Sequence, residues 1–344
     1  PHLPPPVPFI RAILPPIDIA PATRGSDDLT DPAPLTATIL GAGGLGSKFG
    51  ARMAEAGADV WLIARNPHHA AAARNHGLTI VKGDTEQTVP IRASTDSFEP
   101  SPAEFIFVTV KTYDTEVAVR RLAPYLHEDA LAITLQNGLG SIETMAEHFD
   151  EERCVLGVTF EGATLLDPGR VADMGSGTTY LAAGDATRER LARLAEALTA
   201  GGIETEVREQ REVEGLLWGK LAMASGINPI ATVLRVPNGA LSEFEEACEL
   251  SRQAIAETVA VAAAWGIELA FDPHERFEQT TRATRDMSSC TLLDAMRGRR
   301  TEIDAISGAI ADEGDRLGVP TPLHRMLWRI IKAIEATAER RVHE

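Results

Sequence analysis

The stretch TATILGAGGLGSKFG, residues 36–50, places a short apolar run directly before a cluster of glycines. Residues 36–40 predict a buried strand, and the residues after the cluster predict a helix that ends near Gly57. Between them the sequence matches G-x-G-x-x-G, whose glycines allow a tight turn, a close approach of the backbone to pyrophosphate, and close packing of helix on strand. The pattern therefore predicts a dinucleotide site, with a ligand-free glycine turn as the alternative. The residues predicted to bind the cofactor are Gly41, Gly43, Gly44, Leu45 and Gly46.

The next predicted strand, residues 59–64, ends at a basic residue. An enzyme specific for NAD places Asp or Glu near this point to bind the ribose hydroxyls. This chain has Arg65 there, and His68, His69 and Arg74 follow closely. Because positive charge and hydrogen-bond donors suit a 2′-phosphate, we expect NADP(H) as the cofactor. An arginine that is merely exposed to solvent is the alternative.

Strand and helix patterns alternate through the first part of the chain. Further strands are expected at 104–110, 130–135 and 155–160, and helices at 70–76, 114–126 and 141–149. This alternation predicts an α/β Rossmann domain with a doubly wound, mainly parallel sheet over residues 35–209. The mixed segment 162–207, with a strand at 179–183 and a helix at 187–199, is expected to close that domain.

Helical patterns dominate after residue 209. Helices are expected at 213–225, 241–265, 273–285, 292–317 and 323–339, so residues 210–344 predict an all-α domain. Residues 1–34 are rich in proline, which removes amide donors and disfavours helix in the preceding residue. They are therefore expected to form an extended arm.

The composition excludes several classes of protein. Lysine and arginine number 33 against 50 acidic residues, a net charge of −17, so neither nucleic acid nor an anionic membrane surface is an expected partner. No apolar run reaches the roughly 18 to 20 residues that span a bilayer. Three scattered cysteines favour a reducing cytoplasm over a disulfide framework. The spacing of histidines and acids predicts no metal site.

Five motifs follow the glycine loop along the chain: Val110-Lys111-Thr-Tyr-Asp114, Gln136-Asn137-Gly138, Trp218-Gly-Lys220, Asn228-Pro229 and Arg300-Thr-Glu302-Ile-Asp304. With the helical second half, this arrangement resembles the ketopantoate reductase family over about residues 36 to 335. The resemblance implies a Rossmann domain joined to a helical domain like that of 6-phosphogluconate dehydrogenase. It also implies NADPH-dependent reduction of a 2-oxo acid, as in pantothenate biosynthesis.

The resemblance also implies roles for single residues. Lys111 and Asn137 would line the part of the site where the nicotinamide and the substrate bind. Lys220 would be the catalytic acid, and Asn228 and Glu302 would contact the substrate.

Two positions depart from the family pattern. Ala224 stands where the family usually has Asn, and Cys290 stands where it usually has the substrate-binding Ser. The departures leave the identity of the substrate open.

Lys220 suits proton donation on physical grounds as well. On a helix it shares a face with Leu216, Leu217 and Met223, so its ammonium is expected to emerge from an apolar wall that lowers its pKa. A surface lysine that keeps its ammonium in water is the alternative.

Glu302 is expected on a helix at the edge of a buried face, where a carboxylate needs a partner. Either Lys220 or a substrate hydroxyl could supply it, and a local pair with Arg299 is the alternative. Lys111 and Asn137 each follow a predicted strand, at the edge where open α/β sheets bind ligands. A solvated lysine and a simple Asn-Gly turn are their alternatives.

These features predict an oxidoreductase that reduces a small 2-oxo acid with NADPH in a cleft between two domains. Two alternatives stay open: an NADP-dependent dehydrogenase of the same fold acting on another hydroxy or amino acid, and a non-catalytic NADP-binding redox sensor. A homodimer is left open as the assembly state.

Overall fold

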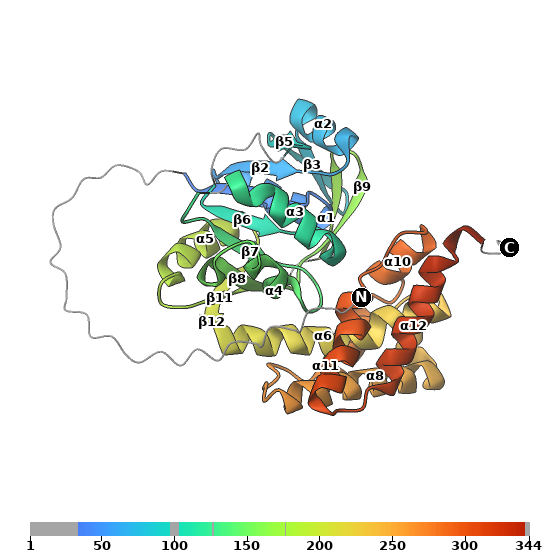
Figure 1. Ribbon diagram of the computed structural model, residues 1–344. Coiled ribbons are helices and arrows are strands. Elements are labelled where there is room, and N and C mark those ends of the chain that lie inside the picture. The colour runs from blue at the N-terminus through green and yellow to red at the C-terminus, as the bar shows by residue number, and fades with distance from the viewer. Residues whose placement is uncertain (1–33, 97–102, 126, 176, 341–344) are drawn as a thin grey trace, which may run out of the picture. The chain divides into compact units, whose positions relative to one another are not determined.

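The computed structural model describes residues 34–96, 103–125, 127–175 and 177–340. The predicted arm, residues 1–34, lies outside them except for Pro34. From Leu35 onward the chain forms one compact unit, in which strands end at Glu209 and helices follow (Figure 1).

The main sheet has eight strands in the order β12-β11-β8-β7-β6-β1-β2-β5. Neighbouring strands are parallel except for the antiparallel pair β11 and β8. The strand order reverses between β1 and β6, and ligands bind at such a switch point in open α/β sheets. The strands are β1 Thr36–Leu40, β2 Asp59–Ile63, β5 Arg92–Ser94, β6 Phe105–Val108, β7 Leu131–Thr134, β8 Cys154–Thr159, β11 Thr179–Ala183 and β12 Thr205–Glu209.

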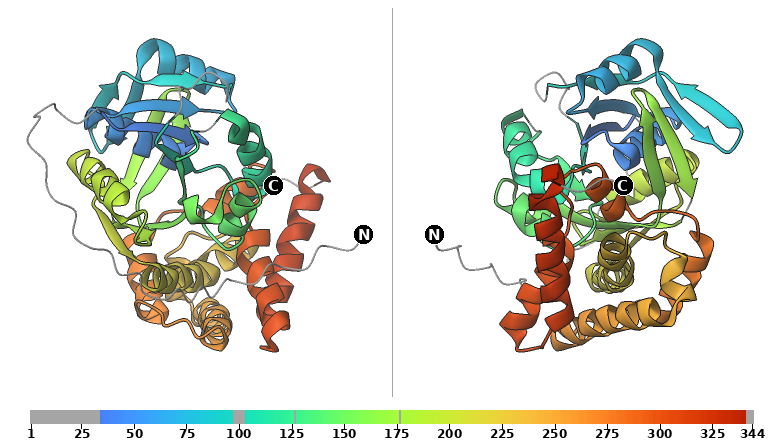
Figure 2. Two further views of the ribbon diagram at one scale, coloured as in Figure 1. Left: turned by 60° about the vertical axis from the view of Figure 1, so that its left-hand side comes forward. Right: turned by 90° about the vertical axis from the view of Figure 1, so that its right-hand side faces the viewer.

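Helices cover both faces of this sheet, as a doubly wound fold requires (Figure 2). On one face α1 (Gly44–Glu55) and α5 (Arg188–Ala200) bury a cluster that includes Ile39 of β1. On the other face α3 (Thr115–Leu122) and α4 (Ser141–Ala146) cover the next residue along β1, which is Leu40. Adjacent residues point to opposite faces of a strand, so a continuous apolar run is needed, and the sequence has one. The predicted fold class is confirmed.

A second sheet was not expected from the sequence. It has four strands in the order β4-β3-β10-β9 and packs against α1, which therefore lies between two sheets. The strands are β3 Leu78–Lys82, β4 Thr85–Val89, β9 Gly162–Asp167 and β10 Arg170–Gly175. The apolar alternation of Leu78 and Ile80, followed by the Gly83 turn, was the available signal for the β3–β4 hairpin.

Helix α6 joins the two halves of the unit, because it contacts the sheet at β8 and also helices α8, α9 and α12. The helices are α2 Pro67–His76, α6 Gln210–Leu234, α7 Ala240–Glu243, α8 Glu245–Ala264, α9 Pro273–Ala283, α10 Cys290–Met296, α11 Ala309–Leu317 and α12 Pro322–Ala336. None of the helices in the described ranges combines the length and apolar character needed to cross a bilayer.

Three predicted helices have different bounds in the structure. The helix expected at 213–225 continues through Pro229, which is buried, so tertiary packing outweighs the hydrogen bond that proline removes. The helix expected at 241–265 breaks at Phe244, which has an extended backbone. The helix expected at 292–317 ends after Met296, because Gly298 adopts a positive φ of 65° and closes α10. A π-helical turn, Asp304–Gly308, then leads into α11.

Candidate active site

The glycine loop has the close contacts that its motif predicts. Gly41 has a φ of +109°, and a Cβ placed on it would lie 2.4 Å from the backbone nitrogen of Val110. A Cβ on Gly46 would lie 2.4 Å from the Thr109 hydroxyl, whereas one on Gly43 would meet nothing within 4 Å. The first and third glycines of the motif are therefore required by packing, and the middle one leaves backbone open to a ligand.

The start of α1 fits a diphosphate. Gly43 is its N-cap and carries no capping side chain, and the first turn contains no acidic residue. The free N–H groups and the positive end of the helix dipole favour an anion there. Gly44 faces the second sheet, because a Cβ on it would lie 2.6 Å from the Ala163 carbonyl oxygen, and Leu45 packs against the core.

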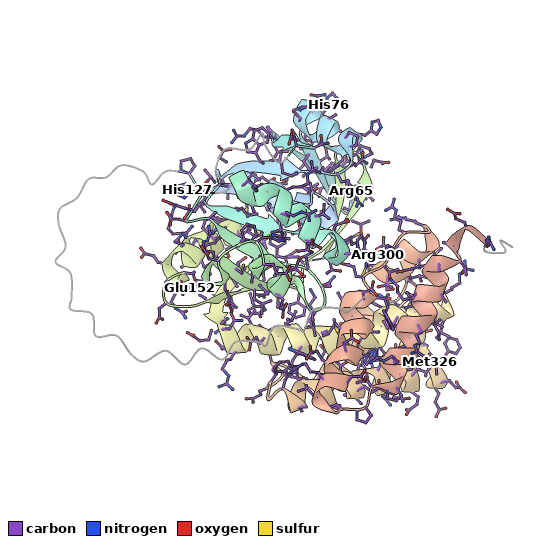
Figure 3. All side chains as sticks on the ribbon, in the orientation of Figure 1. Arg65, His76, His127, Glu152, Arg300 and Met326 are labelled. Atoms are coloured by element: carbon purple, nitrogen blue, oxygen red, sulfur yellow. The ribbon has the colours of Figure 1, made fainter. Side chains whose placement is uncertain are left out.

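Arg65 follows β2 and has an exposed side chain (Figure 3). It pairs with Asp114, with 2.6 Å between Nη1 and Oδ2. Two of the basic residues expected near it are elsewhere. His69 is buried, bonds to the Ser47 hydroxyl at 3.1 Å, and has a pKa lowered by burial. Arg74 lines a separate cavity with Asp59, at the beginning of β2. Arg65 and the exposed His68 are the basic residues left at this strand end.

Lys111, after β6, meets two carboxylates from the helical half. Its Nζ lies 2.9 Å from Asp294 Oδ2 and 3.0 Å from Glu302 Oε2. Burial lowers the pKa of Lys111, but these carboxylates outweigh burial and hold its pKa above the ordinary lysine value. Glu302 also accepts a 3.1 Å hydrogen bond from the Thr112 backbone N–H. Within the described residues Glu302 pairs with Lys111 and not with Lys220 or Arg299, and the helix that would have placed Arg299 beside it is interrupted. The substrate hydroxyl expected as a partner of Glu302 stays a prediction.

Lys220 reaches from α6 to the end of β8. Its ammonium donates a 2.7 Å hydrogen bond to the Thr159 carbonyl and lies 5.8 Å from the centre of the Phe160 ring. Burial lowers the pKa of Lys220 to about 8, and the Cys290 thiol and the Glu302 carboxylate partly oppose this effect. The lowered pKa expected from an apolar wall is confirmed.

A small cavity lies beside Lys220, with a volume of about 10 Å³, room for about one water molecule. It is lined by the loop after β7, which includes Asn137 and Gly138, and by Leu221 and Ala224 of α6. Gly138 has a φ of +89° and lies so close to the π-helical turn that a Cβ would meet the Ala305 carbonyl oxygen at 2.3 Å. The Asn-Gly pair is thus both a turn and part of the cavity wall.

Asn228 and Cys290 are the remaining residues predicted for the site. Asn228 is half-buried on α6, four residues beyond Ala224 and eight beyond Lys220, so the three share one helix face. Cys290 begins α10 and is exposed. The neighbouring Ser289 accepts a hydrogen bond from the Leu292 N–H at 3.2 Å, so its hydroxyl serves as the helix cap.

Sequence reasoning missed a buried ion cluster behind the glycine loop. Lys48 of α1 is 2% exposed and pairs with Glu161 after β8 and with Asp173 of β10, the latter at 2.6 Å. Its ammonium also donates to the Gly175 carbonyl at 3.0 Å. A lysine two residues after the third glycine, on a helix expected to be buried, was the only signal in the sequence.

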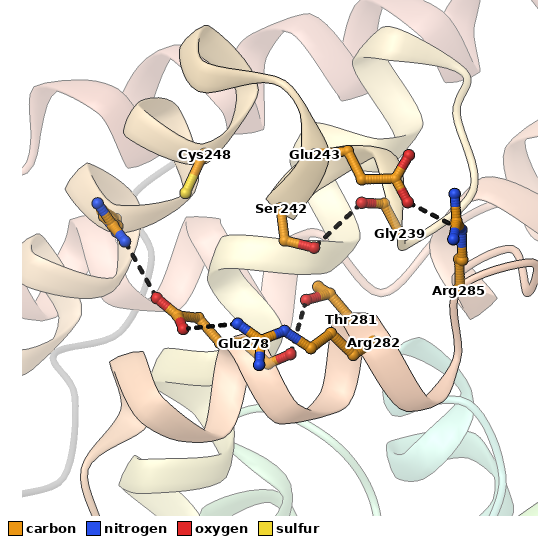
Figure 4. Close-up of a pocket in the computed structure, with 9 residues that line it drawn as sticks. Gly239, Ser242, Glu243, Cys248, Glu278, Thr281, Arg282 and Arg285 are labelled. Carbon is orange, nitrogen blue, oxygen red and sulfur yellow. Dashed lines mark hydrogen bonds and ion pairs between the residues drawn. The ribbon is translucent and has the colours of Figure 1, made fainter.

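A cavity of about 310 Å³ lies in the helical half, between α7, α8 and α9 (Figure 4). Its arginines are already paired: Arg252 and Arg282 share Glu278, and Arg285 pairs with Glu243. None of the predicted site residues lines it. Within the described residues, no group of three histidines, cysteines or acids could hold a metal ion.

Comparison with known proteins gives the family. The family model for ketopantoate reductase PanE/ApbA matches residues 37–186, and the model for its C terminal part matches residues 212–335. The 2-dehydropantoate 2-reductase of Pyrococcus abyssi is 33% identical over 299 residues, covering 87% of this chain and 97% of the relative. The 2-dehydropantoate 2-reductase of Halobacterium salinarum is 33% identical over 306 residues, covering 87% of this chain and 98% of the relative.

Solved structures with a similar fold indicate the same family. A PanE/ApbA family ketopantoate reductase from Ralstonia eutropha has a TM-score of 0.82 at 30% identity, covering 89% of this chain and all of that chain. D-mandelate dehydrogenase with NADH and anilino(oxo)acetate has a TM-score of 0.83 at 25% identity, with the same coverage. Because the two models match both halves and the relatives align over most of their length, the chain belongs to the ketopantoate reductase family of oxidoreductases acting on CH–OH groups.

Proposed function

We propose that this enzyme reduces a 2-oxo acid of the ketopantoate type to the 2-hydroxy acid with NADPH, and that Lys220 donates the proton. The placement of Lys220 carries the proposal. Its ammonium lies at the end of β8, beside Asn137 after β7, on the same edge of the parallel strands as the glycine loop after β1. A proton donor beside a dinucleotide loop is what carbonyl reduction requires.

Bound NADPH would supply the hydride. Lys220 has three N–H donors and gives one to Thr159, which leaves donors for the oxygen of the substrate carbonyl. A pKa of about 8 keeps most of the ammonium protonated at neutral pH and eases transfer of its proton to the forming alkoxide.

Lys111, Asn137 and Asn228 are the groups proposed to hold the substrate. In this structure the Lys111 ammonium is shared between Asp294 and Glu302. These carboxylates use two of its three N–H donors, which leaves one for a substrate carboxylate. Glu302 would then accept a hydrogen bond from a substrate hydroxyl or assist Lys220.

The preference for NADPH is proposed on the basis of Arg65. Its exposed guanidinium stands where an NAD-specific site has a carboxylate, and its pairing with Asp114 keeps it at the strand end. Guanidinium binds phosphate oxygens through paired hydrogen bonds, so Arg65 suits the 2′-phosphate.

A second candidate differs in the substrate. Ala224 and Cys290 replace the amide and hydroxyl usual in the family, which makes the site more apolar. The neighbour with a TM-score of 0.83 is a dehydrogenase of an aromatic hydroxy acid, solved with an anilino-substituted oxo acid. A 2-oxo acid with an aromatic or larger apolar tail is therefore the alternative substrate.

A measurement of turnover distinguishes ketopantoate from an aromatic or larger apolar 2-oxo acid as the substrate. The protein is mixed with NADPH and a panel of 2-oxo acids while the absorbance of reduced nicotinamide is followed. We expect oxidation of NADPH, and kcat/KM ranks ketopantoate against acids with aromatic tails. If no 2-oxo acid is reduced while NADPH still binds, the proposed activity is wrong and a binding-only role would have to be considered.

A further inference from the structure

We propose that helix α12 positions Glu302 through three side chains, Trp328, Lys332 and Glu335, here called the α12 clamp. The inference rests on the proposed function, because it concerns how the site holds a residue assigned to substrate. The three residues recur at intervals of four and three, so they lie on one face of α12. That face meets the turn 300–304, which contains Glu302.

Glu335 holds the residue before Glu302. Its Oε1 accepts hydrogen bonds from both the backbone N–H of Thr301, at 2.8 Å, and the Thr301 hydroxyl, at 2.6 Å. The Thr301 hydroxyl in turn accepts a bond from the Ile303 N–H at 3.3 Å. Thr301 is fully buried, so water cannot replace Glu335 as the acceptor without rearrangement.

Trp328 and Lys332 hold the second residue after Glu302. The Trp328 indole N–H donates to Asp304 Oδ1 at 2.8 Å, and the Lys332 ammonium lies 2.9 Å from Asp304 Oδ2. Lys332 also lies 3.1 Å from Glu335 Oε2, so the clamp is one connected network. Charge-assisted bonds of this kind are stronger and more directional than neutral ones.

Backbone bonds hold Glu302 on its C-terminal side only. Its carbonyl accepts bonds from the N–H groups of Ala305, at 3.0 Å, and Ile306, at 3.2 Å. α10 ends at Met296, so on the N-terminal side the bonds between Thr301 and Glu335 take the place of a helix. The π-helical turn that follows Glu302 is hydrogen-bonded to the loop that contains Asn137, since the Ala305 carbonyl accepts a 2.9 Å bond from the Leu139 N–H. A shift of the turn would therefore move Glu302 and the cavity wall together.

The test compares Glu335→Ala with Glu335→Gln and with Glu339→Ala. We expect Glu335→Ala to lower kcat by about 10- to 100-fold, since misplacing a group by about 1 Å can cost that much. Affinity for NADPH should change by less than about twofold, because the glycine loop is untouched. Glu335→Gln keeps an acceptor oxygen and should recover activity to within about threefold. Glu339 is exposed, and its removal should change nothing.

Hydrogen exchange provides a readout that does not depend on turnover. In Glu335→Ala we expect faster exchange of the amides in residues 300–308, and unchanged exchange in residues 41–50. If Glu335→Ala does not fold, Thr301→Val should show the same faster exchange at the amides of 300–308 other than that of Ile303, because the variant removes the hydroxyl that donates to Glu335 and also accepts from the Ile303 N–H. Normal kcat in Glu335→Ala, or unchanged exchange at 300–308, would overturn the clamp. Absence of turnover in the unmutated protein would instead overturn the proposed function, while exchange still decides the clamp.

Discussion

Lys220 combines a lowered pKa with a place in the cavity beside Asn137. Because proton donation by a side chain contributes about 10²- to 10⁴-fold, Lys220→Ala should lower kcat for reduction by that factor. Affinity for NADPH, measured by titration, should stay nearly constant, since Lys220 is not part of the glycine loop. Near-normal turnover in the variant would exclude Lys220 as the acid.

The pH dependence of the same residue gives an independent prediction. Burial lowers the pKa of Lys220 to about 8, and the acid form is the one present below that pKa. The kcat for reduction should therefore be constant at lower pH and fall as the pH rises through about 8. Lys220→Ala should lose this decline. A profile that is flat up to pH 9.5 in the unmutated enzyme would contradict the role.

Arg65 decides the choice of cofactor in this proposal. Arg65→Glu introduces a carboxylate that repels a 2′-phosphate and can accept bonds from ribose hydroxyls, so the preference for NADPH over NADH should be lost. The ratio of the two dissociation constants is the measurement. Arg74→Glu is a matched control, because Arg74 lines a cavity at the other end of β2. Equal affinity for both cofactors before mutation would show that the assignment is wrong.

At the scale of elements, α1 depends on an ion cluster that its own sequence does not reveal. Lys48 is buried with Glu161 and Asp173, and Lys48→Met would leave Glu161 without its cation and Asp173 with only the more distant Arg52, at 3.8 Å. Breaking a buried pair in this way costs about 3–5 kcal/mol of unfolding free energy, measured by urea denaturation. The variant Lys48→Met with Glu161→Gln and Asp173→Asn removes all three charges and should recover most of the loss. A single variant as stable as the unmutated protein would refute the argument.

The elements predictable from sequence are those with a strong local pattern. Apolar runs gave the six predicted strands of the main sheet, and the glycine motif gave the turn between β1 and α1. The second sheet was missed because β4 is largely exposed and polar, so it carries no apolar signature. Long helices were predicted with wrong bounds where a tertiary contact overrides local preference, as at Pro229, or where one glycine, Gly298, interrupts a periodic pattern.

The sequence predicts a set of candidate site residues but not the contacts between them. Lys111, Asn137 and Lys220 follow strands or share helix faces, which is readable from spacing. The pairing of Lys111 with Asp294 and Glu302 spans 183 and 191 positions in the chain, and no local pattern records such a contact. The pairing depends on how α10 and the turn after it pack against the end of β6.

Across the whole molecule, the two halves are joined by contacts at the site itself. Lys111 of the Rossmann half pairs with Glu302 of the helical half, and Lys220 of α6 bonds to Thr159 of β8. Leu35–Glu344 accordingly forms one compact unit. Thermal unfolding is therefore expected to be a single transition, in which a ligand bound to one half also stabilises the other.

NADP⁺ binding can test this coupling. Three of the four tryptophans, Trp218, Trp265 and Trp328, lie in the helical half, so tryptophan fluorescence mainly reports that half, whereas the glycine loop belongs to the other. At about 100 times its dissociation constant a ligand adds about 2.7 kcal/mol, which should raise Tm by about 4–8 °C. If the halves unfold together, fluorescence and circular dichroism will show the same rise. A fluorescence midpoint that stays fixed while part of the circular dichroism signal moves would mean that the helical half unfolds on its own, and that the contacts of Lys111 and Lys220 do not couple the two.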